Sequence, residues 1–393
     1  MTVNVPPSAS PLDSSPLDSS PLDRHGLRAR VSAALTTFLD RQEEALRQIS
    51  PDLVEPAEAL RSFLDGGKRM RPAFCYWGWR AAGGAQDGSG SQDARDAVEE
   101  AALVASASLE LLQASALIHD DYMDGSDTRR GKPAVHKRFE ALHQAGGWEG
   151  APDRFGAAAA ILLGDITLTW CDEMFTRSGF DAARIHAARP VFDVMRSEVM
   201  AGQYLDVLAQ SRGLSVASPA EILERAETVI RYKSAKYTIE RPLQLGAALA
   251  TGDASESGVL SLALSGYGLP LGEAFQLRDD VLGVFGDPAT TGKPAGDDLR
   301  EGKQTVLVAL AAARAGEMQR KALREGLGDP DLDAAGVAAL QAVIVETGAL
   351  DDVEERIDQR TQRALDALKE APVTDEAREV LGELAIAATS RRG

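Results

Sequence analysis

One long apolar segment constrains the fold of this chain more than any other feature. Residues 93–125 are rich in Ala and Leu, and their apolar side chains surround the helix that their periodicity predicts. Asp93 and Asp96 are suitable caps for the start of this helix, and Gly125 is a suitable stop. A helix that is apolar on every side has to be covered by other elements, so we expect it at the centre of a helical domain.

The rest of the chain predicts more helices and no convincing strand. Residues 218–221 form a capping box with proline at the first helical position, and the helix that they open continues until Pro242 kinks or ends it. Helical periodicity also extends over 260–282 and 306–313. We therefore predict an all-α fold, a bundle of long helices.

Charge and cysteine content exclude several classes of protein. The 393 residues include 60 acidic and 42 basic side chains, a net charge of −18, which argues against a nucleic-acid or anionic-membrane binder. Cys75 and Cys171 are too few for a disulfide framework and lack metal-type spacing. Asp165 interrupts the most apolar stretch, 157–168, which is too short to span a bilayer. We expect a cytoplasmic protein without a transmembrane segment.

The N-terminal residues differ in composition from the rest. The sequence Ser-Pro-Leu-Asp-Ser recurs nearly three times within residues 10–23, with a proline every five residues and little to bury. Such a segment does not gain enough from burial to offset the cost of ordering it. We predict a disordered tail over residues 1–25 and a single all-α domain over residues 26–393.

Two groups of carboxylates end apolar helical segments. Asp120 is four residues and Asp121 three residues before Asp124, so the three carboxylates can share one helix face, at the negative end of the helix dipole. Asp279 and Asp280 end a second such segment. Mg²⁺ binds carboxylate and phosphate oxygens together, so two facing acidic helix ends suit a diphosphate. For either segment alone, an acidic helix end in solvent is the alternative.

Two basic segments supply the positive charge that an anionic substrate needs in this acidic protein. Residues 66–72 read GGKRMRP and residues 129–133 read RRGKP. Arginine side chains bind phosphate through two parallel hydrogen bonds. Either segment alone could be a surface patch, but together with the acidic groups they indicate a diphosphate site.

Seven motifs resemble, in sequence and in order, those of the trans-isoprenyl diphosphate synthases, the polyprenyl synthetase family. They are GGKRMRP, LLQASALIHDDYMD, RRGKP, GQYLD, YKSAKY, FQLRDD and GKPAGDDLREGKQT, and the resemblance covers roughly residues 30–390. Geranylgeranyl diphosphate synthases are the most similar group. The resemblance implies an isoprenoid-synthase-type bundle of long helices around a central cavity, and a homodimer. It also implies an enzyme, with three Mg²⁺ ions per active site, that joins isopentenyl diphosphate to an allylic diphosphate.

The resemblance also assigns roles to the residues at matching positions. The metal ligands would be Asp120, Asp121, Asp124, Asp279 and Asp280. The pocket for isopentenyl diphosphate would contain Lys68, Arg71, Gln113 and Arg130. The allylic diphosphate would be held by Arg129, Gln203, Lys233, Ser234, Tyr237, Gln276, Lys293 and Lys303. Within these sets, the residues expected to act in catalysis are Asp120, Asp121, Lys233, Gln276 and Asp279.

Three positions depart from the usual pattern of this family. Gln113 stands where many members carry histidine, and Ser234 stands where threonine is commoner, but both keep a hydrogen-bonding group. Gly283 stands where the second motif usually has its third aspartate. We expect Asp279 to carry the metal on that side with support from Asp280, and the substitution Gly283→Asp to change activity little.

Histidine and cysteine side chains are not expected to carry the chemistry. His119, beside the first acidic group, is expected to support or pack rather than to act as a general base. His136, His143 and His186 lie in segments predicted to be at the surface. Cys75 stands among aromatic residues that predict core packing.

The length of the product should depend on the helix that ends at Asp120. Ser115 and Ala116 are small at positions where family members that stop at fifteen carbons often carry aromatic side chains. One helical turn deeper, about 5.4 Å along the axis, Leu111 and Leu112 are large enough to obstruct a growing chain. We predict a C20 product, geranylgeranyl diphosphate, with longer chains and farnesyl diphosphate as the alternatives.

A class I terpene cyclase and a non-catalytic partner subunit are the competing functions. A cyclase needs one diphosphate site, whereas the two basic segments supply two, and residues 275–287 do not match the Asn/Ser/Glu metal motif of cyclases. Partner subunits generally lack the aspartates, which are all present in this chain.

Overall fold

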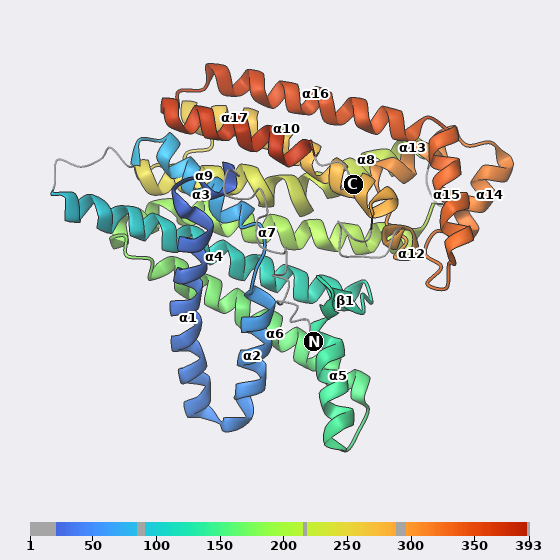
Figure 1. Ribbon diagram of the computed structural model, residues 1–393. Coiled ribbons are helices and arrows are strands. Elements are labelled where there is room, and N and C mark those ends of the chain that lie inside the picture. Colours follow the sequence, from blue (N-terminus) through green and yellow to red (C-terminus); the bar gives the residue numbers. More distant parts are fainter. Residues whose placement is uncertain (1–20, 85–90, 215–217, 288–295, 391–393) are drawn as a thin grey trace, which may run out of the picture.

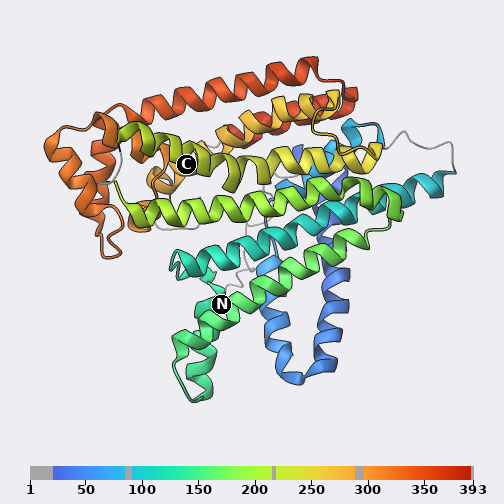
Figure 2. The ribbon, with the colours of Figure 1, turned by 180° about the vertical axis from the view of Figure 1, so that it is seen from behind.

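The computed structural model is helical almost throughout, and the predicted all-α fold is confirmed. It describes residues 21–84, 91–214, 218–287 and 296–390. Within these ranges the only strands are β1 (Thr128–Arg129) and β2 (Lys132–Pro133), a two-residue antiparallel pair. In Figures 1 and 2, the α1–α2 hairpin and α5 project from one side of a bundle of long helices.

The helices differ widely in length, and the longest form the bundle. Two short 3₁₀ segments, η2 (Pro21–Gly26) and η3 (Pro51–Leu53), flank α1. In chain order the longer elements are α1 (Leu27–Ile49), α2 (Val54–Leu64), α3 (Met70–Ala81), α4 (Gln92–Met123), α5 (Val135–Gly146), α6 (Pro152–Thr176), α7 (Ala182–Arg212), α8 (Pro219–Val229), the π-helix η5 (Ile230–Glu240), α9 (Arg241–Thr251), α10 (Val259–Phe285), α12 (Asp297–Arg300), α13 (Val306–Arg314), α14 (Glu317–Gly326), α15 (Ala334–Glu346), α16 (Ala349–Glu370) and α17 (Asp375–Thr389).

The apolar helix α4 is central, as its sequence predicts. It packs against α6, α3 and α1, and most side chains between residues 101 and 115 are buried. Its cap differs from the prediction, because Ser91 rather than Asp93 or Asp96 accepts the hydrogen bond from the N–H of Ala94. The helix therefore begins slightly earlier than predicted and carries its last three carboxylates to the far end.

Among the described residues, α4 and α6 are long and apolar enough to cross a membrane by length and composition, and the bent pair of α15 and α16 would be a third candidate if it formed one span. This differs from the expectation of no such segment, which considered only residues 157–168. In α4, 78% of the most apolar window is buried inside the protein, so its apolar side chains form core. In α6 that share is 44%, and Phe155, Ile161 and Leu162 remain exposed.

The helix that begins at the Ser218 capping box changes from α-helical to π-helical hydrogen bonding partway along. The capping box is present, but α8 passes at Ile230 into the π-helix η5, which continues into α9. Pro242 lies in the first turn of α9, where a missing N–H costs no helical hydrogen bond. Pro242 therefore marks the return to α-helical winding rather than the end of a helix.

The backbone of η5 lies very close to both neighbouring helices. A Cβ on Gly202 of α7 would be 2.3 Å from the backbone N of Lys233. A Cβ on Gly272 of α10 would be 2.6 Å from the Cα of Ala235. Glycine at both positions lets α7 and α10 approach η5 from two sides, which fixes the directions of the side chains that η5 carries.

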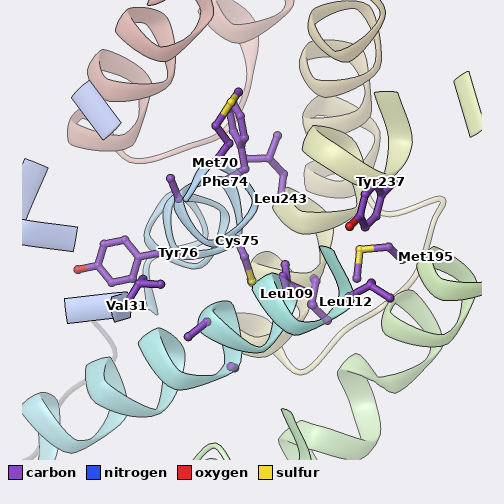
Figure 3. Packing of buried hydrophobic residues seen from close by; sticks show 14 of the residues in the cluster. Val31, Met70, Phe74, Cys75, Tyr76, Leu109, Leu112, Met195, Tyr237 and Leu243 are labelled. Carbon is purple, nitrogen blue, oxygen red and sulfur yellow. The ribbon is translucent and has the colours of Figure 1, made fainter. Parts of the chain in front are cut away.

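The core around α3 and α4 contains the cysteine and the aromatic residues that the sequence analysis assigned to packing. Cys75 is fully buried, as are Tyr76, Trp77 and Trp79. Figure 3 shows Cys75 and Tyr76 on α3 above Leu109 on α4. Burial raises the pKa of the Cys75 thiol to about 12, so this side chain is an unreactive thiol and not a nucleophile.

The first described residues are ordered against the C-terminal helix. Arg24 forms ion pairs with Glu379 and Glu383 of α17, and Nε2 of His25 lies 2.8 Å from Oε1 of Glu376. Residues 21–25 were predicted to belong to the disordered tail, and the structure instead places them in η2. The rest of that tail, residues 1–20, lies outside the described residues.

Candidate active site

A cavity of about 1100 Å³ lies where α4 and α10 end, between the two acidic groups. Most of the residues predicted from the sequence line it: Lys68, Arg71, Gln113, Ala116, Asp120, Arg129, Arg130, Gln203, Lys233, Ser234, Tyr237, Gln276, Asp279, Asp280 and Lys303. Asp121 and Asp124 lie behind this lining, with 1% and 2% of their side chains exposed. Lys293 lies outside the described residues.

Asp120 is held ionised by neighbours from α7 and η5. Its Oδ1 accepts hydrogen bonds from Nε2 of Gln203 at 2.7 Å and from Nζ of Lys233 at 3.0 Å. Burial alone would raise its pKa, but the positive charges of Lys233 and Lys303 lower the pKa of Asp120 to about 2. Lys233 is itself shared with Asp206, 2.6 Å away.

Asp121 and Asp124 each face a further cation. The β1–β2 turn, in which Arg130 has φ 52°, folds the chain back so that Nε of Arg129 donates to Oδ1 of Asp121 at 2.8 Å. Nζ of Lys303 lies 3.5 Å from Oδ2 of Asp124. Burial and the charge of Asp120 raise the pKa of Asp124 to about 6, so this carboxyl is a much weaker acid than Asp120.

The second acidic group depends on amide and hydroxyl partners. Oγ of Ser234 donates to Oε1 of Gln276, and Nε2 of Gln276 donates to Oδ1 of Asp280 at 2.8 Å. Burial, opposed by the hydrogen bond from Gln276, raises the pKa of Asp280 to about 8, and the charge of Asp298 acts in the same direction. Ser234 and Gln276 thus form a chain of hydrogen bonds from η5 to α10.

The space beside Gly283 is filled by a residue from another helix. Oδ2 of Asp298, on α12, lies 1.9 Å from the position that a Cβ would take on Gly283. An aspartate at position 283 would therefore collide with the carboxylate of Asp298. The expectation that Gly283→Asp changes activity little stays a prediction, and the substitution requires the carboxylate of Asp298 to move.

Residues of both basic segments line the same cavity as the acidic ends. The guanidinium of Arg71 stacks 4.1 Å from the ring centre of Tyr237 and donates to Oγ1 of Thr238 at 2.7 Å. The hydroxyl of Tyr237 donates to Oε1 of Gln113 at 2.7 Å. Since the carbonyl oxygen of Gln113 is used, its amide N–H groups are what it can offer to a phosphate.

A buried ion pair anchors the first basic segment. Arg69 has φ 54° and only 4% of its side chain is exposed, and its Nη1 donates to Oε2 of Glu110 at 2.6 Å. Arg130 reaches this segment, with Nη2 3.3 Å from the Cβ position of Gly67. Fixing Arg69 in the core leaves Lys68 directed to the cavity, which brings both basic segments to one place.

The residues expected to control product length lie in different environments. Ala116 lines the cavity, but Ser115 and Leu112 are fully buried and do not. Ser115 is displaced by about 100° around the helix from Ala116, so it faces away from the cavity. Leu112 is one turn below Ala116, and Figure 3 shows it in the core that also holds Met195 and Tyr237. Leu112 therefore belongs to packed core beyond the cavity rather than to its lining.

Two histidines that were expected at the surface are buried. His136 packs edge-to-face against Tyr122, and Nε2 of His143 lies 3.1 Å from the carbonyl oxygen of Glu149, because α5 turns both toward its packed face. His186 is exposed, as predicted. His119 lines the cavity above Gly164, where a Cβ would be 2.1 Å from its Nε2.

Four acidic residues near the cavity, Asp206, Asp297, Asp298 and Glu301, were missed by sequence reasoning. Asp206 contacts Lys233, Asp298 fills the space at Gly283, and Oε1 of Glu301 accepts from Oγ of Ser126 at 2.9 Å. Asp206 is three residues after Gln203, which on a helix places both on one face. That spacing could have identified it, because GQYLD was already recognised as a motif. Asp298 and Glu301 stand within the recognised motif GKPAGDDLREGKQT, but the sequence does not show that they approach α10 and Ser126.

The acidic groups suit Mg²⁺ although they are not gathered into a closed cage. Among the described residues, no three Asp, Glu, His or Cys side chains surround one point that could hold a metal ion. The carboxylates of α4 instead face Lys233, Arg129 and Lys303. Oδ1 of Asp124 is buried without a hydrogen-bond partner in this part of the chain, which leaves a hard oxygen donor available. Mg²⁺ normally keeps water and phosphate oxygens besides one or two carboxylates, so such a donor set fits it.

Comparisons with known proteins agree with this geometry. The profile of the polyprenyl synthetase family matches residues 54–344. Geranylfarnesyl diphosphate synthase of Aeropyrum pernix is 32% identical over 341 residues, 86% of this chain and 93% of that protein. Geranylgeranyl diphosphate synthase of Saccharolobus solfataricus is 28% identical over 326 residues, 81% of this chain and 84% of that protein.

A solved structure extends the similarity to three dimensions. The crystal structure of geranylgeranyl pyrophosphate synthase from Corynebacterium glutamicum, complexed with isoprenyl diphosphate and magnesium, is 44% identical in sequence, with a TM-score of 0.85. The similarity covers 93% of this chain and 99% of that one.

Proposed function

The chain belongs to the polyprenyl synthetase family, and on that basis we propose that this trans-prenyltransferase makes all-trans geranylgeranyl diphosphate from isopentenyl diphosphate and an allylic diphosphate. The observation that carries the proposal is one cavity in which two acidic helix ends meet two basic segments. Two diphosphates can be accommodated there, although the protein as a whole carries a charge of −18.

The basic residues divide between the two substrates. Lys68, Arg71 and Arg130 hold isopentenyl diphosphate beside the amide of Gln113. Arg129, Lys233 and Lys303 hold the allylic diphosphate, and Lys293 is proposed to join them. The positions of the described residues around one cavity support this division. Arginine contributes paired hydrogen bonds and lysine a compact charge, so both substrates are oriented as well as attracted.

The carboxylates of both helix ends would hold Mg²⁺, with three ions per active site. Asp120, Asp121 and Asp124 form one side, and Asp279 and Asp280 form the other. Bound Mg²⁺ neutralises negative charge on the diphosphate as it departs. When Lys233 leaves Asp120, its ammonium can donate to the same diphosphate, which favours departure in an electrostatically prepared site.

The reaction forms one carbon–carbon bond and breaks one carbon–oxygen bond. The allylic C–O bond breaks, and the diphosphate leaves with the electron pair. The double bond of isopentenyl diphosphate then attacks the allylic cation, and the adduct loses a proton, which the released diphosphate takes up. Apolar walls from Val199, Ile230 and Phe275 exclude water that would quench the cation to an alcohol. Gln276 and Tyr237 border this region and position the reacting ends.

The C20 product follows from the wall that α4 presents. Ala116 leaves room beside Asp120, and the packed core that contains Leu112 begins one turn deeper. A chain longer than C20 is the second candidate, because the relative from Aeropyrum pernix is named for a C25 product. A farnesyl product would require a larger side chain near position 116.

Incubating the purified chain with labelled isopentenyl diphosphate, Mg²⁺ and allylic primers of different lengths tests this proposal. After dephosphorylation, chromatography should show a C20 alcohol as the main product. A main product of C15, or of C25 and above, would refute the predicted length but keep the enzyme class. A cyclic hydrocarbon made without isopentenyl diphosphate would indicate a terpene cyclase. No turnover with any primer would favour a non-catalytic partner subunit.

The homodimer expected from the resemblance is proposed to form through α6. Phe155 and Leu162, two turns apart on one face of this helix, are exposed apolar side chains that a second copy could cover. Sedimentation should give twice the mass of one chain, and Leu162→Glu should shift it to the monomer.

The cytoplasmic location stays a prediction, and fractionation of cells expressing the tagged chain tests it.

A further inference from the structure

Gly283 of α10 and Asp298 of α12 occupy one space beside Asp279. The carboxylate of Asp298 lies against Gly283, with Oδ2 1.9 Å and the carboxyl carbon 2.5 Å from the Cβ position. Both residues line the same cavity as Asp279. Because a Cβ cannot approach another atom so closely, the position of Asp298 depends on the absence of a side chain at 283.

The start of α12 holds Asp298 in this place. Gly296 precedes the helix with φ 74°, and a Cβ there would be 2.5 Å from Cγ1 of Val337. The N–H of Lys303 donates to the carbonyl oxygen of Asp298 at 3.0 Å, which closes the short helix. The backbone of Asp298 is thus fixed on both sides, so its carboxylate is directed to α10.

A single lysine connects Asp298 with the other acidic helix end. Nζ of Lys303 lies 3.4 Å from Oδ1 of Asp298 and 3.5 Å from Oδ2 of Asp124. Only 14% of the side chain of Asp298 is exposed. A partly buried carboxylate that shares its cation with the α4 end faces the space between the two acidic ends, where a diphosphate and its metal would lie.

We propose that Asp298 supplies the third carboxylate of the second acidic end, in the space left by Gly283, and helps Asp279 to hold Mg²⁺. This inference rests on the proposed function and deepens its account of the metal site. The carboxylate comes from a different helix, so the second aspartate motif is completed in space rather than in sequence. It also follows that a side chain at 283 would displace the carboxylate of Asp298 from this position.

Exchanging the two side chains tests this relation. The variants are Asp298→Asn, Gly283→Asp, and Gly283→Asp combined with Asp298→Gly. Gly382→Asp is the matched control, because Gly382 is also helical but has open space around its Cβ position. The readouts are the affinity for Mn²⁺ in the presence of inorganic pyrophosphate, followed by electron paramagnetic resonance, and the thermal unfolding midpoint. Neither readout requires turnover.

Asp298→Asn should weaken Mn²⁺ binding at least fivefold. Gly283→Asp should lower the unfolding midpoint and weaken Mn²⁺ binding, and the double variant should recover both to within about twofold and a few degrees of wild type. Mn²⁺ binding by Asp298→Asn within twofold of wild type would overturn the proposal, as would a double variant no better than Gly283→Asp. If Gly283→Asp does not fold, the Asp298→Asn measurement decides alone. Failure of wild type to elongate any allylic primer would instead refute the proposed function.

Discussion

Two acidic helix ends face each other across the cavity, and their buried carboxylates are stabilised in different ways. At the end of α4, Asp120, Asp121 and Asp124 each face a lysine or an arginine. At the end of α10, Asp280 receives a hydrogen bond from the neutral amide of Gln276. The pKa of Asp120 is lowered to about 2, whereas burial raises that of Asp280 to about 8.

This difference shows that the negative charge of a buried aspartate can be balanced by a nearby cation or removed by protonation. The α4 end carries more carboxylates, at the negative end of a long helix dipole, and it is supplied with cations from three other segments. The α10 end has fewer carboxylates in its own sequence, and Asp280 has no cation within ion-pair distance among the described residues, so protonation of Asp280 offsets the cost of its burial. Without metal, the α4 end is therefore ionised and the α10 end is partly neutral.

The largest expected effect is at the α4 end. Asp120→Asn removes the carboxylate that Lys233 and Gln203 orient, so kcat should fall by about 1000-fold, roughly 4 kcal/mol in activation free energy. The KM for isopentenyl diphosphate should change little, because Lys68 and Arg71 are untouched. Steady-state kinetics with Asp96→Asn, an exposed aspartate of the same helix, as the control checks this. A loss within threefold would remove Asp120 from the metal site.

Lys303 contacts carboxylates at both acidic ends, so replacing it tests whether this cation stabilises them. Lys303→Met leaves Asp124 and Asp298 without a shared cation, so the metal-free protein should unfold several degrees lower than wild type. Mg²⁺ with inorganic pyrophosphate should restore most of the loss, since metal ions replace the missing charge. Differential scanning calorimetry with and without these ligands measures both values. An unchanged midpoint in the metal-free state would show that Lys303 does not compensate the carboxylates.

Product length should distinguish the α4 side from the α10 side. Ala116→Phe inserts a ring one turn below Asp120, so the main product should shorten from C20 to C15. Leu282→Ala, on the α10 lining, should leave the length unchanged. Ser115→Phe should lower stability rather than shorten the product, because Ser115 is buried away from the cavity. Chromatography of the dephosphorylated products decides, and a longer product from Leu282→Ala would contradict the assignment of α4 as the limiting wall.

The smallest expected effect is on the pH dependence of stability, which depends on the protonation of Asp280. In the folded metal-free protein Asp280 keeps its proton up to about pH 8, whereas an unfolded aspartate loses it near pH 4. The folded state thus binds more protons between these values, so wild type should lose stability relative to Asp280→Asn as pH rises from 5 to 8. The slope has an upper limit of about 1.4 kcal/mol per pH unit. Denaturant unfolding at several pH values tests it, and parallel curves for the two proteins would refute the raised pKa.

The sequence predicted those parts of the fold and of the cavity lining that depend on residues close together in the chain. The periodicity around α4, the Ser218 capping box and the spacing of Asp120, Asp121 and Asp124 depend on residues close in the chain, and each is present in the structure. The resemblance brought distant segments to one site, and most of its predicted residues do line one cavity.

What the sequence missed depends on contacts between distant segments. The carboxylate of Asp298 on the short helix α12 packs against Gly283 of α10. No rule based on residue spacing predicts that these two helices contact each other. Ser115 was placed on the cavity because adjacent residues were treated together, although they differ by about 100° around a helix. His136 and His143 were assigned to the surface because their polarity was considered without the packing of α5 on α6. Burial in each case follows from packing between separate helices, which the local pattern of residues does not specify.

The contrast between the two acidic ends is tested most directly by a crystal structure of the protein with Mg²⁺ and an unreactive allylic thiodiphosphate. The account predicts metal ions at both ends, one near Asp120 and one near Asp279 with the carboxylate of Asp298 turned toward it. Lys233 and Lys303 should have moved from the carboxylates to the diphosphate. Metal at the α4 end alone, with Asp298 turned away and both lysines still paired with aspartates, would contradict it.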